Sequence, residues 1–174
     1  MGRALATLGR LHDWLTDAGY VLGAAALFAM AASYFFEVFA RYFFSAPTAW
    51  ASVTVAHLLL VTVFLLLPHA TRAVNHIAVD LVFQLLPAWS RPLRAAVNAV
   101  GFLVCSFATV MSFDENVRQY ADFIYTEGNI QFPKWWASSF ITFGFAMSAL
   151  WFLRLAFDGR PANPRLRLIP RATP

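Results

Sequence analysis

Glu37 and Arg41 lie within the first long apolar stretch of the sequence, where charged side chains are candidates for chemistry. A carboxylate in a membrane-spanning helix can carry a proton or bind a cation, so Glu37 is a candidate coupling residue. The two residues are four apart with the glutamate first, which is the favourable order for an ion pair on one face of a helix. They also lie toward the end of the stretch, where a charge costs less than at mid-membrane. The spacing therefore predicts a structural ion pair.

Histidine is the other residue type whose position suggests chemistry. His57 falls inside the second apolar stretch, where a histidine could bind a haem iron. The next histidine, His69, is twelve residues further on, about 18 Å along a helix, so it does not supply a second axial ligand at the same depth. Cys105 is the only cysteine, which excludes an intramolecular disulfide and a thiolate-rich metal site. We therefore predict packing roles for His57 and Cys105, and no metal or cofactor.

The segment from Pro68 to Pro87 is amphipathic, and apolar stretches lie on both sides of it. Its polar side chains recur every fourth residue and form one stripe on a helix: Arg72, His76, Asp80 and Gln84. Its apolar side chains turn the other way, among them Ile77, Leu81 and Leu85. This pattern predicts an interfacial helix over about 71–86 that lies flat on a membrane surface.

The composition is typical of an integral membrane protein. Of the 174 residues, 60% are hydrophobic and only 13% are charged. We predict an all-α membrane domain over 18–157 with four transmembrane helices, at about 18–44, 50–67, 93–113 and 133–157. The first span exceeds the roughly 20 residues that cross the hydrocarbon, so it must tilt or protrude. Gly19 and Gly23 give it a smooth surface for close packing of another helix.

Both ends of the chain carry basic residues. Residues 1–17 place leucines at helical spacing among charged residues, which predicts a second interfacial amphipathic helix, and 158–174 form a basic tail. With the termini and the 68–94 segment on one side, that side holds ten of the thirteen Lys and Arg residues. The other side holds Arg41, Arg118 and Lys134. The positive-inside rule then predicts that both termini are cytoplasmic, so the net charge of +4 reports topology and not nucleic-acid binding.

The connection between the third and fourth spans is acidic and aromatic. Its charged side chains are Asp114, Glu115, Arg118, Asp122, Glu127 and Lys134. Its aromatic side chains alternate with them: Tyr120, Phe123, Tyr125 and Phe132. Such a connection can fold down onto the outer membrane surface or contact a soluble partner, and the sequence leaves both open.

The spans lack the signatures of several function classes. The sequence has no GxxxxGK[ST] loop for a nucleotide-driven pump. It shows no broken helices or facing repeats with ion-binding groups at mid-depth, as a stand-alone transporter would. No cluster resembles a catalytic dyad or triad, so we predict that the chain is not an enzyme. The remaining interpretation is a membrane scaffold or a partner subunit.

Several short motifs make this sequence similar to the small membrane (Q) subunit of tripartite ATP-independent periplasmic (TRAP) transporters. They are Arg41-Tyr42-Phe43-Phe44, a proline turn before Trp50, Arg72-x3-His76-Ile77-x-Val79-Asp80, and Leu86-Pro87. The resemblance covers about 18–157. Family members often carry glutamate just after the tryptophan, where this sequence has Ala51-Ser52-Val53, so no role is assigned to such carboxylates.

The resemblance implies a division of labour in a bacterial inner membrane. A large multi-span subunit carries the substrate and sodium sites, a periplasmic binding protein delivers a small organic acid, and this subunit braces the large one among the membrane lipids. The residues then expected to serve structure or the partner interface are Glu37, Arg41, Trp50, Arg72, His76 and Asp80.

Two other function classes stay open on the residues alone. A four-helix membrane anchor of a respiratory enzyme would use His57 as a haem ligand and would show a Soret band. A small proton-coupled exporter would use Glu37 and would transport when reconstituted alone.

Overall fold

Four long helices make up the described structure, a computed structural model that describes residues 2–45, 48, 50–73, 90–126 and 131–158. The helices are α1 (Gly2–Phe44), α2 (Ala51–Ala73), α4 (Ser90–Ala121) and α5 (Lys134–Asp158). Each is long and apolar enough to cross a membrane, over Thr7–Phe44, Ala51–Arg72, Ala95–Ala121 and Lys134–Ala156. The predicted all-α fold with four membrane-spanning helices is confirmed at this level.

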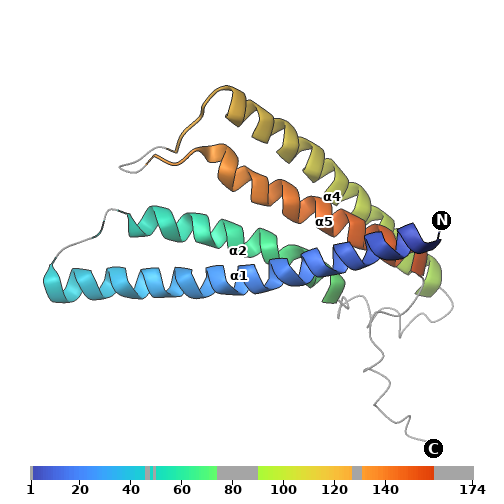
Figure 1. The fold of residues 1–174 in the computed structure, drawn as a ribbon, viewed down its shortest axis with the longest axis horizontal. Helices are drawn as coiled ribbons and strands as arrows, with labels where there is room; N and C mark the ends of the chain where they lie inside the picture. Colours follow the sequence, from blue (N-terminus) through green and yellow to red (C-terminus); the bar gives the residue numbers. More distant parts are fainter. Residues whose placement is uncertain (1, 46–47, 49, 74–89, 127–130, 159–174) are drawn as a thin grey trace, which may run out of the picture.

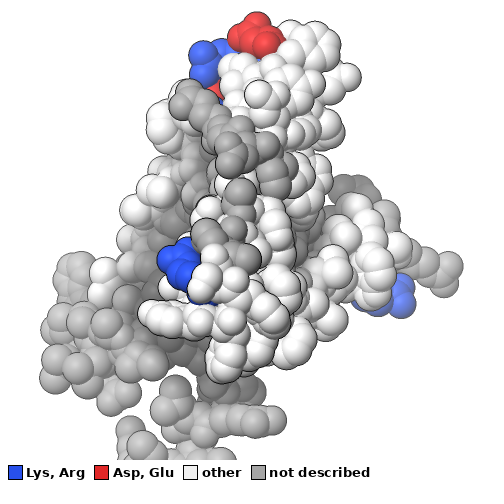
Figure 2. Space-filling view, turned by 90° about the vertical axis from the view of Figure 1, so that its left-hand side faces the viewer, with Lys and Arg blue, Asp and Glu red and all other residues white. Residues whose placement is uncertain are grey.

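The helices form a fan of two hairpins (Figure 1). α1 packs against α2, α2 against α5, and α5 against α4. The hairpins converge where α1 begins and α5 ends, and they diverge toward the opposite end (Figure 1). Viewed onto that opposite end, the described atoms are mostly uncharged, with a few charged side chains among them (Figure 2). At the converging end, polar side chains of α1 bond to α5.

The first helix is continuous for 43 residues, about 65 Å. No break separates residues 2–17 from the span that follows, although we expected an interfacial helix there as a separate element. In this first part, one face turns inward with His12 and Thr16, while Leu11 and Trp14 are exposed. That this part lies at a membrane surface stays a prediction.

The second helix runs through Pro68 and ends at Ala73, whereas the sequence led us to end the span at Leu67. Proline lacks the N–H that would bond to the Phe64 carbonyl, so an interior proline normally disrupts a helix. Here α5 packs closely on that carbonyl. A Cβ added to Gly144 of α5 would lie only 2.5 Å from the Phe64 oxygen. Close packing of a neighbouring helix is one way in which membrane helices tolerate proline.

Arg72 therefore belongs to the last turn of α2. The predicted interfacial helix over 71–86 falls mostly outside the described residues, and His76 and Asp80 are among those not described.

Glycines allow close contact in two of the seams. Gly19 and Gly23 of α1 lie against α2. A Cβ added to Gly19 would come within 3.3 Å of the Leu65 carbonyl oxygen, and one added to Gly23 within 3.0 Å of the Leu66 side chain. The predicted smooth surface on α1 is confirmed by this contact. In the other hairpin, a Cβ on Gly101 of α4 would meet the Phe152 ring of α5 at 2.7 Å.

Candidate functional site, a polar network between three helices

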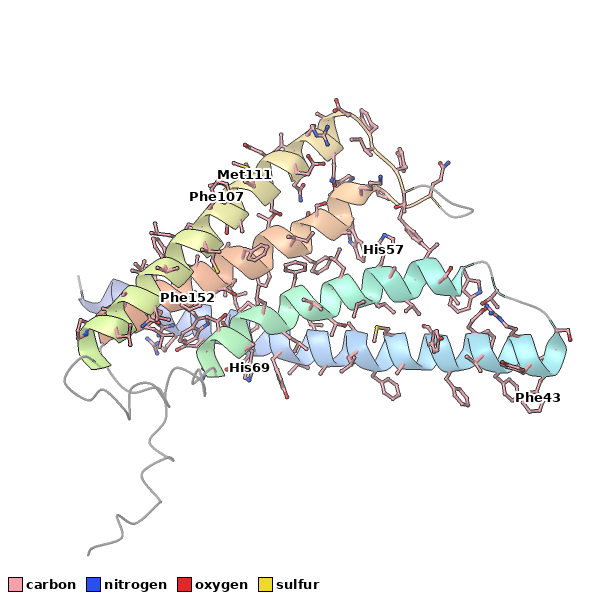
Figure 3. The ribbon with its side chains drawn as sticks, turned by 180° about the vertical axis from the view of Figure 1, so that it is seen from behind. Phe43, His57, His69, Phe107, Met111 and Phe152 are labelled. Carbon is pink, nitrogen blue, oxygen red and sulfur yellow. The ribbon has the colours of Figure 1, made fainter. Side chains whose placement is uncertain are left out.

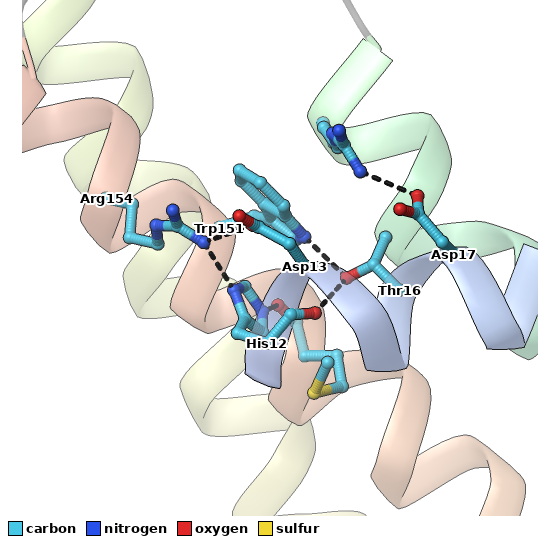
Figure 4. A network of polar contacts seen from close by, with 8 residues as sticks. His12, Asp13, Thr16, Asp17, Trp151 and Arg154 are labelled. Atoms are coloured by element: carbon cyan, nitrogen blue, oxygen red, sulfur yellow. Dashed lines mark hydrogen bonds and ion pairs between the residues drawn. The ribbon is translucent and has the colours of Figure 1, made fainter. Parts of the chain in front are cut away.

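His12 of α1 is the centre of a polar network at the converging end (Figure 4). The side chain is buried, with its Nε2 3.2 Å from the Met147 carbonyl oxygen and its Nδ1 3.0 Å from Nη1 of Arg154. A guanidinium can only donate and a carbonyl can only accept. We therefore assign the proton to Nε2, which makes His12 a neutral imidazole that donates to Met147 and accepts from Arg154.

Thr16 extends the network by one helical turn. Trp151 donates its Nε1–H to Thr16 Oγ1 at 2.9 Å, and the same hydroxyl donates to the His12 carbonyl oxygen at 2.9 Å. Thr16 is only 1% exposed, so this hydroxyl is cut off from water. The Trp151 ring also packs on the His12 imidazole, with 4.8 Å between the ring centroids.

Two arginines from different helices complete the network. Arg154 of α5 bonds to Asp13 of α1, and Arg72 of α2 bonds to Asp17 of α1, each at 2.7 Å from nitrogen to oxygen. Both guanidinium groups lie over the Trp151 indole, 4.5 Å from its centroid for Arg154 and 5.4 Å for Arg72. Arg72, which we predict to begin the polar stripe of the 71–86 segment, is exposed and also contacts α1 through Asp17 and α5 through Trp151.

This arrangement is a clasp, by which we mean His12, Asp13, Thr16, Asp17, Arg72, Trp151 and Arg154. Its ion pairs are partly exposed and contribute on the order of 0–1 kcal/mol each. The buried hydrogen bonds matter more, because an unpaired buried donor costs about 1–3 kcal/mol. Its polar groups bind one another across three helices, and the described residues contain no group of three or more metal-binding side chains. The clasp is suited to fixing the geometry of the helices.

Glu37 and Arg41 form the ion pair that their spacing predicts, at 2.7 Å from Oε1 to Nη2. Glu37 is only 7% exposed, and its other carboxylate oxygen accepts from the Thr48 backbone N–H at 3.1 Å. This second contact joins the end of α1 to the chain that leads into α2, near the positive end of the α2 dipole. Trp50 lies at the same place, with its ring 6.0 Å from that of Phe36. Glu37 therefore holds the α1–α2 turn in place.

The histidines of α2 have packing contacts. The carbonyl of Val53 accepts from Nδ1 of His57 at 2.7 Å, one turn back on the same helix, and the His57 ring lies 5.6 Å from that of Phe132. The His69 ring packs against that of Tyr20 of α1, tilted by 32°, with 4.3 Å between the ring centroids. They lie at opposite ends of α2 (Figure 3). His57 thus has a hydrogen bond within its helix and a ring contact, which agree with the packing role predicted for it.

A third set of polar contacts closes the α4–α5 seam. Ser112 and Thr142 share a hydrogen bond of 2.8 Å, Asn116 donates to Ser139 Oγ at 2.9 Å, and Ser138 donates to Gln119 Oε1 at 2.7 Å. Residues 112, 116 and 119 recur at helical spacing, as do 138 and 142. This periodicity is the signal from which the seam could have been found.

The clasp was also missed by sequence reasoning, except for Arg72. His12 and Thr16 are four residues apart and thus share one face of a helix, which is the local signal for the α1 side. Their partners on α5 are about 135 residues away in the chain, so the pairing depends on the tertiary fold.

Comparison with known proteins adds one match. Residues 30–160 match the family model of the DctQ component of tripartite ATP-independent periplasmic transporters. No curated protein and no solved structure matches the chain. The matched range includes Glu37, Arg72 and the α5 side of the clasp, whereas His12 and Thr16 precede it.

Proposed function

The chain belongs to the DctQ family of tripartite ATP-independent periplasmic transporter components, and on this premise we propose that it is the small scaffold subunit of a sodium-driven transporter. In this proposal the complex is a secondary-active symporter for a small organic acid. A periplasmic binding protein delivers the acid, and a large multi-span subunit carries the substrate and sodium sites. The family match is the observation that carries the proposal.

The polar contacts of the helices support a scaffold role. The clasp, the Glu37–Arg41 pair and the α4–α5 seam each join hydrogen-bonding groups of the chain to one another. A scaffold must keep its shape against a moving partner, and such contacts fix helices relative to one another in lipid. Membership in a family of transporter components also supports this proposal over a respiratory anchor that would bind haem at His57.

The proposed location is the bacterial inner membrane, with both termini and the 71–86 segment on the cytoplasmic side. The distribution of Lys and Arg along the sequence supports this orientation. Cysteines introduced at Ile77 and Gln84 test it, because a helix lying flat buries position 77 and exposes position 84. A water-soluble maleimide added from the cytoplasmic side should label only position 84. Equal labelling, or labelling only from the periplasm, would reject the flat helix or the orientation.

Six residues stay candidates for structure or for the partner interface: Glu37, Arg41, Trp50, Arg72, His76 and Asp80. Glu37 and Arg72 have internal partners, so we propose that they act on the partner indirectly, through the helix positions that they fix.

Reconstitution tests the whole proposal. Purification from the native membrane should recover a large membrane subunit, identified by mass spectrometry. Liposomes with both membrane subunits and the binding protein should accumulate an organic acid under a sodium gradient. Liposomes that contain only this chain should not. Uptake by the chain alone would reject the scaffold role and favour a small exporter.

A further inference from the structure

The described residues on the two sides of the α4–α5 connection pair with each other, at the end of the molecule where the hairpins diverge (Figure 1). Thr126 N–H donates to the Phe132 carbonyl at 2.8 Å, and Lys134 N–H donates to the Ile124 carbonyl at 3.0 Å. Tyr125 pairs with Pro133 between these bonds in an antiparallel bridge. The residues that flank the tip of the connection are therefore held in place against the start of α5.

Phe123 has an unusual backbone in this connection. Its φ is 50°, the left-handed region that glycine or asparagine normally occupies just after a helix. The turn is made by the Ile124 N–H, which donates to the Gln119 carbonyl at 3.1 Å. Two backbone bonds fix this conformation, because the Phe123 N–H also donates to the Tyr120 carbonyl at 3.4 Å. Phe123 is nevertheless 74% exposed, so its side chain has little packing within the described chain and is available for a contact outside it.

Other exposed rings belong to the connection or to the adjoining turns of α4 and α5, which also carry charged groups. Tyr120 is 62% exposed, Tyr125 48% and Trp136 43%. Arg118 and Glu115, on the last turns of α4, form an ion pair at 2.7 Å. Aromatic rings next to charged groups are the composition of the zone between lipid tails and water.

The depth of the connection follows from α5. Lys134 and Arg154 are twenty residues apart, about 30 Å along the helix, which matches the hydrocarbon thickness of a bilayer. Lys134 then lies at one hydrocarbon boundary. The hydrogen bond from Lys134 to Ile124 places Phe123 and Tyr125 just beyond that boundary. The headgroup zone begins at this boundary and is about 5–7 Å deep on each side.

We propose that the described residues on both sides of the α4–α5 connection form a membrane anchor, in which Phe123, Tyr120, Tyr125 and Trp136 enter the lipid headgroup zone. α4 also carries exposed apolar side chains along its candidate membrane span, among them Phe107 and Met111 (Figure 3). A soluble partner would need these rings to project beyond the headgroups, whereas the backbone bonds hold them at the boundary. The proposal rests on membrane crossing alone and does not depend on the substrate, on the partner subunits or on which leaflet lies at this end.

A spin label measures the position of Phe123 directly. The chain is changed to Cys105→Ser, one cysteine is introduced at Phe123 or at the exposed mid-helix Val110, and each labelled complex is placed in phospholipid nanodiscs. Collision rates with oxygen, which concentrates in the tails, and with a water-soluble nickel chelate give the depth. We expect position 110 to report the hydrocarbon and position 123 the headgroup zone.

Two outcomes would overturn the anchor. A label at 123 that collides freely with the nickel chelate, and whose collision rates indicate no depth in the bilayer, lies in water. A label at 123 that is immobile and shielded from both reagents is covered by protein.

A pair of substitutions separates the ring from the backbone. Phe123→Asn accommodates the left-handed φ better but removes the ring, and Phe123→Trp keeps an aromatic ring. An anchor predicts that the asparagine variant loses thermal stability in nanodiscs while the tryptophan variant keeps it. An asparagine variant as stable as the wild type, or more stable, would show that the ring has no external contact.

Discussion

Replacing Thr16 with valine should weaken the clasp by a defined amount. Valine keeps the shape of threonine but removes the hydroxyl that accepts the Trp151 indole N–H at 2.9 Å. Both residues are buried, so the indole N–H would be left without a partner, which costs about 1–3 kcal/mol. We expect the free energy of unfolding to fall by that amount, measured by denaturant titration in mixed micelles with far-UV circular dichroism.

Two further variants test whether the indole contact is the cause. Thr16→Ser keeps the hydroxyl and removes one methyl group, so its cost should stay near 0.8 kcal/mol. Thr16→Val combined with Trp151→Phe removes both partners, and the double variant should be more stable than the sum of the two single changes predicts. A valine variant as stable as the wild type, or strict additivity in this cycle, would refute the structural role that we assign to the clasp.

Three other substitutions probe separate contacts. Glu37→Gln breaks the ion pair, so the yield of the assembled complex should fall while the sodium dependence of uptake stays unchanged. A changed ratio of sodium to substrate at normal yield would make Glu37 a coupling residue. Gly144→Ala would place a Cβ 2.5 Å from the Phe64 backbone oxygen and should lower the free energy of unfolding by about 1–3 kcal/mol. Gly101→Ala should cost less, because the Phe152 ring that its Cβ would meet can move. Ser148 is 0% exposed and its hydroxyl has no hydrogen-bond partner. Ser148→Ala should therefore preserve both stability and uptake. Lost uptake at normal yield would reveal a role for that hydroxyl.

Local patterns in the sequence were sufficient for much of the fold. Composition and span length predict four membrane helices, and the pairing of Glu37 with Arg41 follows from their spacing within one helix. The continuation of α2 through Pro68 could not be found this way, because it depends on Gly144 of another helix. The clasp is a similar case, since the polar residues on α1 could equally be surface side chains until their partners on α2 and α5 are known. Sequence periodicity shows which residues share a face, but not which distant face meets it.

The depth of the polar groups bears on where transport chemistry takes place in the proposed complex. α1 is uncharged from Asp17 to Glu37 and α5 is uncharged from Lys134 to Arg154, each about 30 Å of helix. The charged side chains at these limits bind one another in the clasp or the Glu37–Arg41 pair, with the exception of Lys134 at the start of α5. A coupling ion or a carboxylate substrate needs polar ligands between these levels, near the middle of the bilayer. Charges placed at both boundaries instead fix the depth and orientation of the helices. This arrangement supports the proposal that the subunit positions a partner, and that the partner conducts the ion and the substrate.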